Sequence, residues 1–149
     1  MRPGRGTGPA LLSVVAGWAA RADRVVVRPV LDPADPDTAA TRAVDRHDPP
    51  DPMRELVMLR DGQCVFPGCR VDARSCDLDH VVAYVDPDDG GPPGQTSPDN
   101  LACLCRRHHR LKTFSGWAYE RLLDGSYRWT SPRGQSFVSF PLPKRGPAR

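Results

Sequence analysis

Apolar positions in this chain occur in short runs, and stretches rich in Asp, Gly and Pro separate these runs. The first run, residues 10–22, is helix-prone. The next, residues 24–31, has the β-branched residues of a strand, with Pro29 favouring an edge position. Residues 32–52 hold many Asp and Pro and few apolar side chains, which is typical of a linker. Residues 1–52 are therefore predicted to be a loosely ordered N-terminal segment.

The apolar pattern after residue 52 changes between helical and strand periods within short distances. Asp51-Pro52 is suited to starting a helix, and the Asp-Gly pair at 124–125 is suited to the turn of a hairpin. The order of elements predicts an α+β fold. The predicted elements are helices over residues 53–60 and 105–113, strands over 77–84 and 100–104, a hairpin of 117–123 and 127–130, and a further strand over 135–140.

Composition limits the size of the hydrophobic core. The chain has 149 residues with 13 Gly and 17 Pro, and only 39% of it is hydrophobic. Residues 53–140 are therefore predicted to form one small domain that needs a staple, followed by a basic tail over residues 141–149. Five cysteines are an odd number, which argues against a complete disulfide framework and for metal binding in a reducing compartment. We therefore expect a cytoplasmic protein.

The run at residues 10–22 allows two interpretations. Because Arg2 and Arg5 precede it, the run has features of a signal peptide. The metal-like cysteine pattern instead favours an amphipathic helix that remains from a larger upstream domain. In either case the run is too short to span a bilayer, so no membrane partner is expected.

Two half-sites with the spacing of zinc ligands lie far apart in the sequence. Cys64 and Cys69 flank a turn made by Pro67-Gly68, and Cys105 and His108 lie three residues apart on a predicted helix, where they share a face. Three thiolates and one imidazole form a common closed site for structural Zn²⁺. Cys76 and Cys103 are alternative ligands, or buried thiols.

A second set of residues is interleaved with the first. The combined pattern C-x4-C, DLDH and NL-x3-C-x2-HH resembles the HNH (His-Asn-His) endonuclease family, over about residues 53–140. The resemblance implies a zinc-stapled ββα-metal core, extended here by the C-terminal hairpin. It also implies that the chain is the C-terminal nuclease module of a larger protein, with residues 1–52 as the remnant of an upstream domain and a linker.

The resemblance assigns roles to four residues. His80 would be the general base that activates water, and Asp79 with His109 would hold a catalytic divalent metal, Mg²⁺ or Mn²⁺. Asn100 would orient the base or steady the loop. Because adjacent strand residues point to opposite faces, a twist or bulge is expected to bring the Asp79 carboxylate to the metal while His80 faces the water.

The two adjacent histidines are predicted to serve different ions. Consecutive residues of an α-helix diverge by about 100°, since the helix has 3.6 residues per turn. His108 and His109 therefore should not share one ion: His108 suits the zinc site and His109 the catalytic metal.

Charge is distributed unevenly along the chain. The net charge of +3 combines +4 in residues 1–30, −9 in residues 31–100 and +8 in residues 101–149. The basic third begins at the second predicted helix and suits DNA phosphates, with Arg106, Arg107, Arg110 and Lys112 as candidate contacts. The leading hypothesis is a metal-dependent endonuclease acting on DNA. The alternatives are a catalytically inactive zinc-binding module for nucleic acid and a zinc-stapled protein-interaction domain. The sequence leaves the oligomeric state open.

Overall fold

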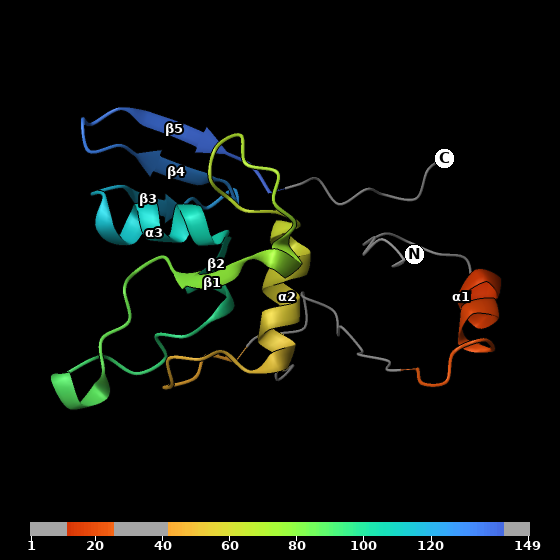
Figure 1. Cartoon of the computed structure of the whole chain (residues 1–149). Helices are drawn as coiled ribbons and strands as arrows, with labels where there is room; N and C mark the ends of the chain where they lie inside the picture. The colour runs from red at the N-terminus through yellow and green to blue at the C-terminus, as the bar shows by residue number, and fades with distance from the viewer. Residues whose placement is uncertain (1–11, 26–41, 142–149) are drawn as a thin grey trace. The chain divides into compact units, whose positions relative to one another are not determined.

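The computed structural model describes residues 12–25 and 42–141, which belong to two units (Figure 1). The first unit contains α1 (Leu12–Ala19), and this helix buries none of its residues. The strand predicted over residues 24–31 and the basic tail fall almost entirely outside the described residues. Within the described ranges, no helix has both the length and the apolar character that crossing a membrane requires.

The second unit is a mixed α/β domain with two small antiparallel sheets, which confirms the predicted α+β class. The first sheet pairs β1 with β2, and the second has the order β3-β4-β5. The helices and strands are α2 (Asp51–Asp61), β1 (Asp77–His80), β2 (Leu101–Leu104), α3 (Arg106–Phe114), β3 (Ala118–Arg121), β4 (Tyr127–Thr130) and β5 (Ser136–Ser139). Short 3₁₀ turns lie at Ala73–Ser75, Pro87–Asp89 and Pro98–Asn100.

Several predicted boundaries were wrong, each for a local reason. β1 ends at His80, four residues before the predicted end, because the backbone of Val81 and Val82 bonds to Asn100 instead. Asn100 ends a 3₁₀ turn capped by the Ser97 hydroxyl, so β2 starts one residue late. Cys105 is the N-cap of α3 and not its first residue.

The core lies where α2, β2 and the C-terminal sheet meet. Every residue of β2 is fully buried, and α2 packs on this strand through Met53, Leu56 and Val57. Gly62 ends α2 with φ +68°, a left-handed conformation that a side chain would oppose. Figure 1 shows α3 following β2 directly, and β2 pairs with β1 across the loop of residues 81–100.

Aromatic residues of β3 and β4 cover the turn between Cys64 and Cys69. The Trp129 indole donates to the Val65 carbonyl at 3.0 Å, and its ring lies 5.0 Å from that of Phe66. Tyr119 stacks on Trp129 with ring centroids 4.3 Å apart. The C-terminal sheet is therefore part of the support of this turn and not an independent appendage.

A buried ion pair joins α2 to both sheets. The Asp61 side chain is completely buried and accepts hydrogen bonds from the Arg60 guanidinium, the Tyr127 hydroxyl and the Cys103 amide. Arg60 also donates to the carbonyl groups of Pro98 and Leu101. All the charged and polar atoms of this network have partners, as a buried pair requires.

Removal of the Asp61 carboxylate should destabilise the domain strongly. Asp61→Ala leaves the Arg60 charge and the Cys103 amide without their partner, and breaking a buried pair in this way costs about 3–5 kcal/mol. We expect the melting temperature to fall by roughly 10 °C or more. The control is Glu120→Ala, which removes an exposed partner of Arg128 and should change stability by less than about 1 kcal/mol. Equal melting temperatures for the two variants would contradict the role of Asp61.

Residues 42–50, which were predicted to be part of the linker, instead pack on the domain. Val44 forms a backbone bridge with Thr96, and the Asp45 carboxylate accepts from the Gly94 amide at 2.6 Å. The Tyr84 hydroxyl donates to the Asp45 carbonyl at 3.0 Å. This segment has few apolar side chains, so its docking depends on backbone and polar contacts that hydropathy does not predict.

Candidate functional site

Four side chains from two distant segments converge at the start of α3. The Sγ atoms of Cys64, Cys69 and Cys105 and Nδ1 of His108 all lie within 4.8 Å of one another. The Cys69 and Cys105 sulfurs are 4.0 Å apart, and His108 Nδ1 lies 3.4 Å from Cys64 Sγ and 3.3 Å from Cys105 Sγ. The predicted Cys3His cluster is therefore confirmed as a group that could hold a metal ion.

The dimensions of this cluster fit a tetrahedral zinc site. With Zn–S near 2.3 Å and Zn–N near 2.0–2.1 Å, a tetrahedron places sulfurs about 3.8 Å apart and sulfur and nitrogen about 3.6 Å apart. These three separations lie close to both values, and all four atoms lie within 4.8 Å of one another. All five cysteines are free thiols, so no disulfide competes for these ligands.

The surroundings of the cluster also suit a metal. Burial raises the pKa of the Cys69 thiol to about 11, and a bound cation would act in the opposite direction by binding the thiolate. Burial lowers the pKa of His108, which favours the neutral imidazole that binds metals. The His108 ring stacks on Phe66 with centroids 3.9 Å apart, so its orientation is fixed.

Cys76 and Cys103 are not members of the four-residue cluster. The Cys76 thiol donates to the Asp72 carbonyl and lies against Cys64, whose pKa this contact raises. The Cys103 thiol is completely buried and donates to the Val57 carbonyl. Both are packed thiols, one of the two roles that the sequence left open.

The other face of α3 carries His109, which lies between two carboxylates of β1. His109 Nδ1 is 3.0 Å from Asp77 Oδ2, and Nε2 is 3.3 Å from Asp79 Oδ1. Residues 77 and 79 are two positions apart on one strand, so they share a face. The structure thus brings Asp79 and His109 together and adds Asp77, which the sequence analysis missed although the D-x-D spacing in a strand could have indicated it.

Asp79 has two further partners. Lys112 Nζ lies 2.9 Å from Asp79 Oδ2 and also donates to the His80 carbonyl, and the Tyr119 hydroxyl donates to the same Oδ2 at 2.7 Å. Burial raises the pKa of Tyr119 well above its ordinary value, so this phenol stays protonated and donates. Lys112, predicted as a phosphate contact, therefore lies beside the carboxylate in this structure.

His80 lies on the opposite face of β1 from Asp79, and no bulge separates them. Asp79 pairs with Ala102 and His80 with Leu101 in an unbroken antiparallel register. The His80 side chain is buried, and its Nε2 lies 2.8 Å from the Thr96 hydroxyl. Burial, assisted by the neighbouring His47, lowers the pKa of His80, which favours a neutral ring at pH 7. Of the twist or bulge expected from the sequence, the bulge is therefore absent, because the register is unbroken from Asp77 to His80.

Asn100 binds the loop that follows β1. Its Oδ1 accepts from the Val82 amide at 2.8 Å, and its Nδ2 donates to the carbonyl groups of Val82 and Gln95 at 3.1 and 2.8 Å. Of its two predicted roles, these contacts fit the steadying of the loop.

The arginines of α3 remain on the surface. Arg106, Arg107 and Arg110 are all exposed, and Arg106 also lies 3.3 Å from Asp77 Oδ2. Their exposure leaves them available to an anionic partner.

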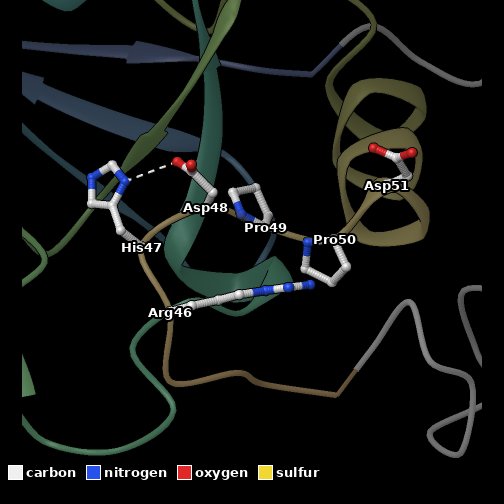
Figure 2. A pocket seen from close by; sticks show the side chains of 6 residues that line it. All are labelled: Arg46, His47, Asp48, Pro49, Pro50 and Asp51. Carbon is white, nitrogen blue, oxygen red and sulfur yellow. Dashed lines mark hydrogen bonds and ion pairs between the residues drawn. The ribbon is translucent and has the colours of Figure 1, made fainter.

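The segment before α2 adds a second histidine. The His47 ring centroid lies 5.0 Å from that of His80, and the Tyr84 centroid lies 5.5 Å from that of His80 and 5.1 Å from that of His47. His47 lines a shallow pocket formed by residues 46–51, and Figure 2 shows its ring bonded to Asp48 at the edge of that pocket. Nothing in the sequence spacing indicated that His47 would approach residue 80.

Relatives of this chain occur in Mycobacterium tuberculosis. The chain is 42% identical to the uncharacterized protein Rv3776 over 101 residues and 44% identical to the uncharacterized protein Rv2100 over 90 residues. These matches cover 67% and 60% of this chain but only 18% and 15% of the relatives, so the chain spans less than a fifth of their length. No family model matches the chain, and no solved structure matches it.

Proposed function

We propose that residues 42–141 form an HNH-type nuclease module that hydrolyses phosphodiester bonds of DNA with the help of a divalent metal. The observation that carries the proposal is the facing pair of Asp79 and His109, with Nε2 and Oδ1 3.3 Å apart, one residue from the buried neutral imidazole of His80. The consecutive order of β1, β2 and α3 supports a ββα-metal core.

In this proposal Asp79 on one face of β1 binds the metal, and His80 on the other face acts as the base. Asp79 and His109 hold the cation, whose oxygen and nitrogen ligands suit Mg²⁺ or Mn²⁺. Such an ion supplies a Lewis acid for the scissile phosphate. His80 takes the proton from the attacking water, and its lowered pKa favours the form that can accept it.

Lys112 and Tyr119 set the charge at Asp79. A lysine ammonium 2.9 Å from Asp79 neutralises the carboxylate, and a divalent cation would compete with it for the same oxygens. Once displaced, the ammonium of Lys112 can contact a phosphate. Tyr119 is fixed by its stacking on Trp129, so its hydroxyl would orient Asp79 both when Lys112 is the partner and when a divalent cation is bound.

The exposed arginines of α3 support DNA as the partner. Arg106, Arg107 and Arg110 lie within two turns of the helix that carries His109, so phosphates bound by them would lie beside the candidate metal site. Zinc in the Cys3His cluster would hold the start of this helix in place.

One observation favours the second candidate, an inactive zinc module that binds nucleic acid. Both oxygens of Asp79 already have partners within the chain, as expected of a carboxylate with a purely structural role. The two candidates differ in whether added divalent metal produces cleavage.

A plasmid assay tests the proposal. The zinc-loaded chain is incubated with supercoiled DNA in Mg²⁺ or Mn²⁺, with EDTA and with His80→Ala as controls. We expect nicked and linear products only with the parent chain and divalent metal. DNA binding without metal-dependent cleavage would favour the inactive module.

Asp77 should tune the affinity of the catalytic metal. Its carboxylate accepts from His109 Nδ1 at 3.0 Å, which leaves Nε2 as the ligand nitrogen and raises its basicity. Asp77→Asn is expected to weaken Mn²⁺ binding by about 10–100-fold while the zinc content stays unchanged. Titration of Mn²⁺ measured by calorimetry checks this, with Asp99→Asn as a control at an exposed carboxylate. Unchanged Mn²⁺ affinity in Asp77→Asn would exclude the role.

A further inference from the structure

Thr96 is a buried polar residue for which the proposed function has so far given no role. It has no exposed surface, and its hydroxyl has two neighbours. The His80 Nε2 atom lies 2.8 Å from Thr96 Oγ1, and the His47 carbonyl oxygen lies 3.3 Å from the same atom. The hydroxyl therefore stands between an imidazole and a backbone acceptor.

Counting protons determines the direction of these two hydrogen bonds. A hydroxyl has one proton to donate, and a carbonyl oxygen can only accept. Both contacts are hydrogen bonds only when the Thr96 proton goes to the His47 carbonyl and Thr96 Oγ1 accepts from His80 Nε2. Neutral His80 must then carry its proton on Nε2, which leaves the lone pair on Nδ1.

This arrangement suits a group that gains a proton during the reaction. The neutral Nε2–H form and the imidazolium both donate from Nε2, so the bond to Thr96 is kept in both states. In the other neutral form, with the proton on Nδ1, Thr96 would have to donate to Nε2 and would lose its bond to the His47 carbonyl. Thr96 thus selects the form with a free Nδ1 and does not have to rearrange when that nitrogen is protonated.

The position of Thr96 is itself fixed from two directions. Its backbone bonds to Val44 in both senses, at 2.9 and 3.3 Å, and the preceding Gln95 carbonyl accepts from the Asn100 side chain. The rings of His47 and Tyr84 pack around the His80 ring and oppose its rotation. Residues 44–48 therefore contribute to the site through the backbone as well as through a side chain.

We propose that Thr96 is a positioning residue for His80, which it holds in the Nε2–H form through its bond to the His47 carbonyl. This inference rests on the proposed function, because it assigns Nδ1 of His80 as the atom that accepts the proton of the attacking water. A base needs a third group that sets its orientation, and Thr96 meets that requirement without a charge.

Nitrogen-15 NMR of the zinc-loaded full chain tests the inference without any substrate. The ring nitrogen shifts of His80, assigned with His80→Gln, should show a protonated Nε2 and an unprotonated Nδ1 at a pH where the ring is neutral. Thr96→Val removes the hydroxyl and should lose this preference, whereas Thr96→Ser should restore it. Zinc content and melting temperature are measured for each variant, with Thr130→Val, on an exposed position of β4, as the matched control.

Cleavage of DNA supplies a second readout. Misorienting a catalytic group can cost roughly 10²-fold in rate, so kcat should fall by about that factor in Thr96→Val, with KM nearly unchanged, and recover in Thr96→Ser. A parent chain with the proton on Nδ1 of His80, or a folded Thr96→Val variant that keeps the Nε2–H form, would overturn the inference. If the parent chain shows the expected form and cleaves no DNA, the positioning by Thr96 stands and the nuclease proposal fails.

Discussion

Replacement of Cys105 with Ser is expected to release the structural metal and unfold the second unit. Cys105 lies at the start of α3 and faces the turn of residues 64–69. Its sulfur lies within 4.8 Å of the other three candidate ligand atoms. Binding of zinc at such sites contributes about 10–16 kcal/mol at pH 7, and a domain of this size is stable by only about 5–15 kcal/mol. Loss of one thiolate therefore removes a share of stability that the small core does not replace.

Metal analysis and circular dichroism measure this result. The purified parent chain should carry about one zinc per chain, and Cys105→Ser should show less zinc and no cooperative melting transition. Cys103→Ser is the matched control, because Cys103 is also buried but bonds to a backbone carbonyl. It should keep the zinc and lose only about 1–3 kcal/mol. A Cys105→Ser variant with the zinc content and melting temperature of the parent would exclude a structural metal.

The largest effect on activity is expected from His80→Ala, with His109→Ala failing for a different reason. Removal of a general base costs about 10²–10⁴-fold in rate, so His80→Ala should lose cleavage and still bind Mn²⁺. His109→Ala should lose both DNA cleavage and Mn²⁺ binding, since Nε2 of His109 faces Asp79. Neither substitution touches the thiolate cluster, so both variants should keep their zinc.

His108→Ala separates the two sites on α3. Its Nδ1 lies 3.3 and 3.4 Å from two of the cysteine sulfurs, so this variant should lose zinc, melt at lower temperature and lose cleavage as a consequence. Zinc content, melting temperature and plasmid nicking are compared across the three variants. If His109→Ala released the zinc and His108→Ala remained active, the two assignments would have to be exchanged. Parental cleavage by all three would refute the nuclease proposal.

The sequence predicted best those features that depend on local spacing. The i, i+3 relation of Cys105 and His108 and the Pro-Gly turn before Cys69 were sufficient to predict the Cys3His cluster. The divergence of His108 and His109 around α3 also follows from helix geometry, and His108 contacts a cysteine sulfur while His109 contacts the Asp79 carboxylate. Short-range backbone geometry fixes these relations before any tertiary contact forms.

The features that the sequence did not predict depend on contacts between distant segments. The buried Asp61 carboxylate accepts a hydrogen bond from Tyr127, and the Thr96 hydroxyl beside His80 lies against the carbonyl of residue 47. The hydropathy pattern predicts neither contact. Every residue has a backbone carbonyl, and in the sequence a buried Asp61 cannot be distinguished from an exposed aspartate at the end of a helix. Asp77 was partly predictable. Its spacing from Asp79 places both side chains on one face of β1, but the sequence did not indicate that His109 on α3 would be its partner.

Because His108 and His109 are adjacent, α3 connects the Cys3His cluster to the carboxylates that face His109. One ring faces the thiolates and the next faces Asp79, and the backbone between them is held in a regular helix. A rotation of the helix about its axis would therefore turn both imidazoles by the same angle. An ion bound in the thiolate cluster would set the rotation of this helix about its axis, and that rotation would set the distance between His109 and Asp79. A cation of different radius in the Cys3His cluster would therefore change the position of His109 relative to Asp79 on the other face of the helix.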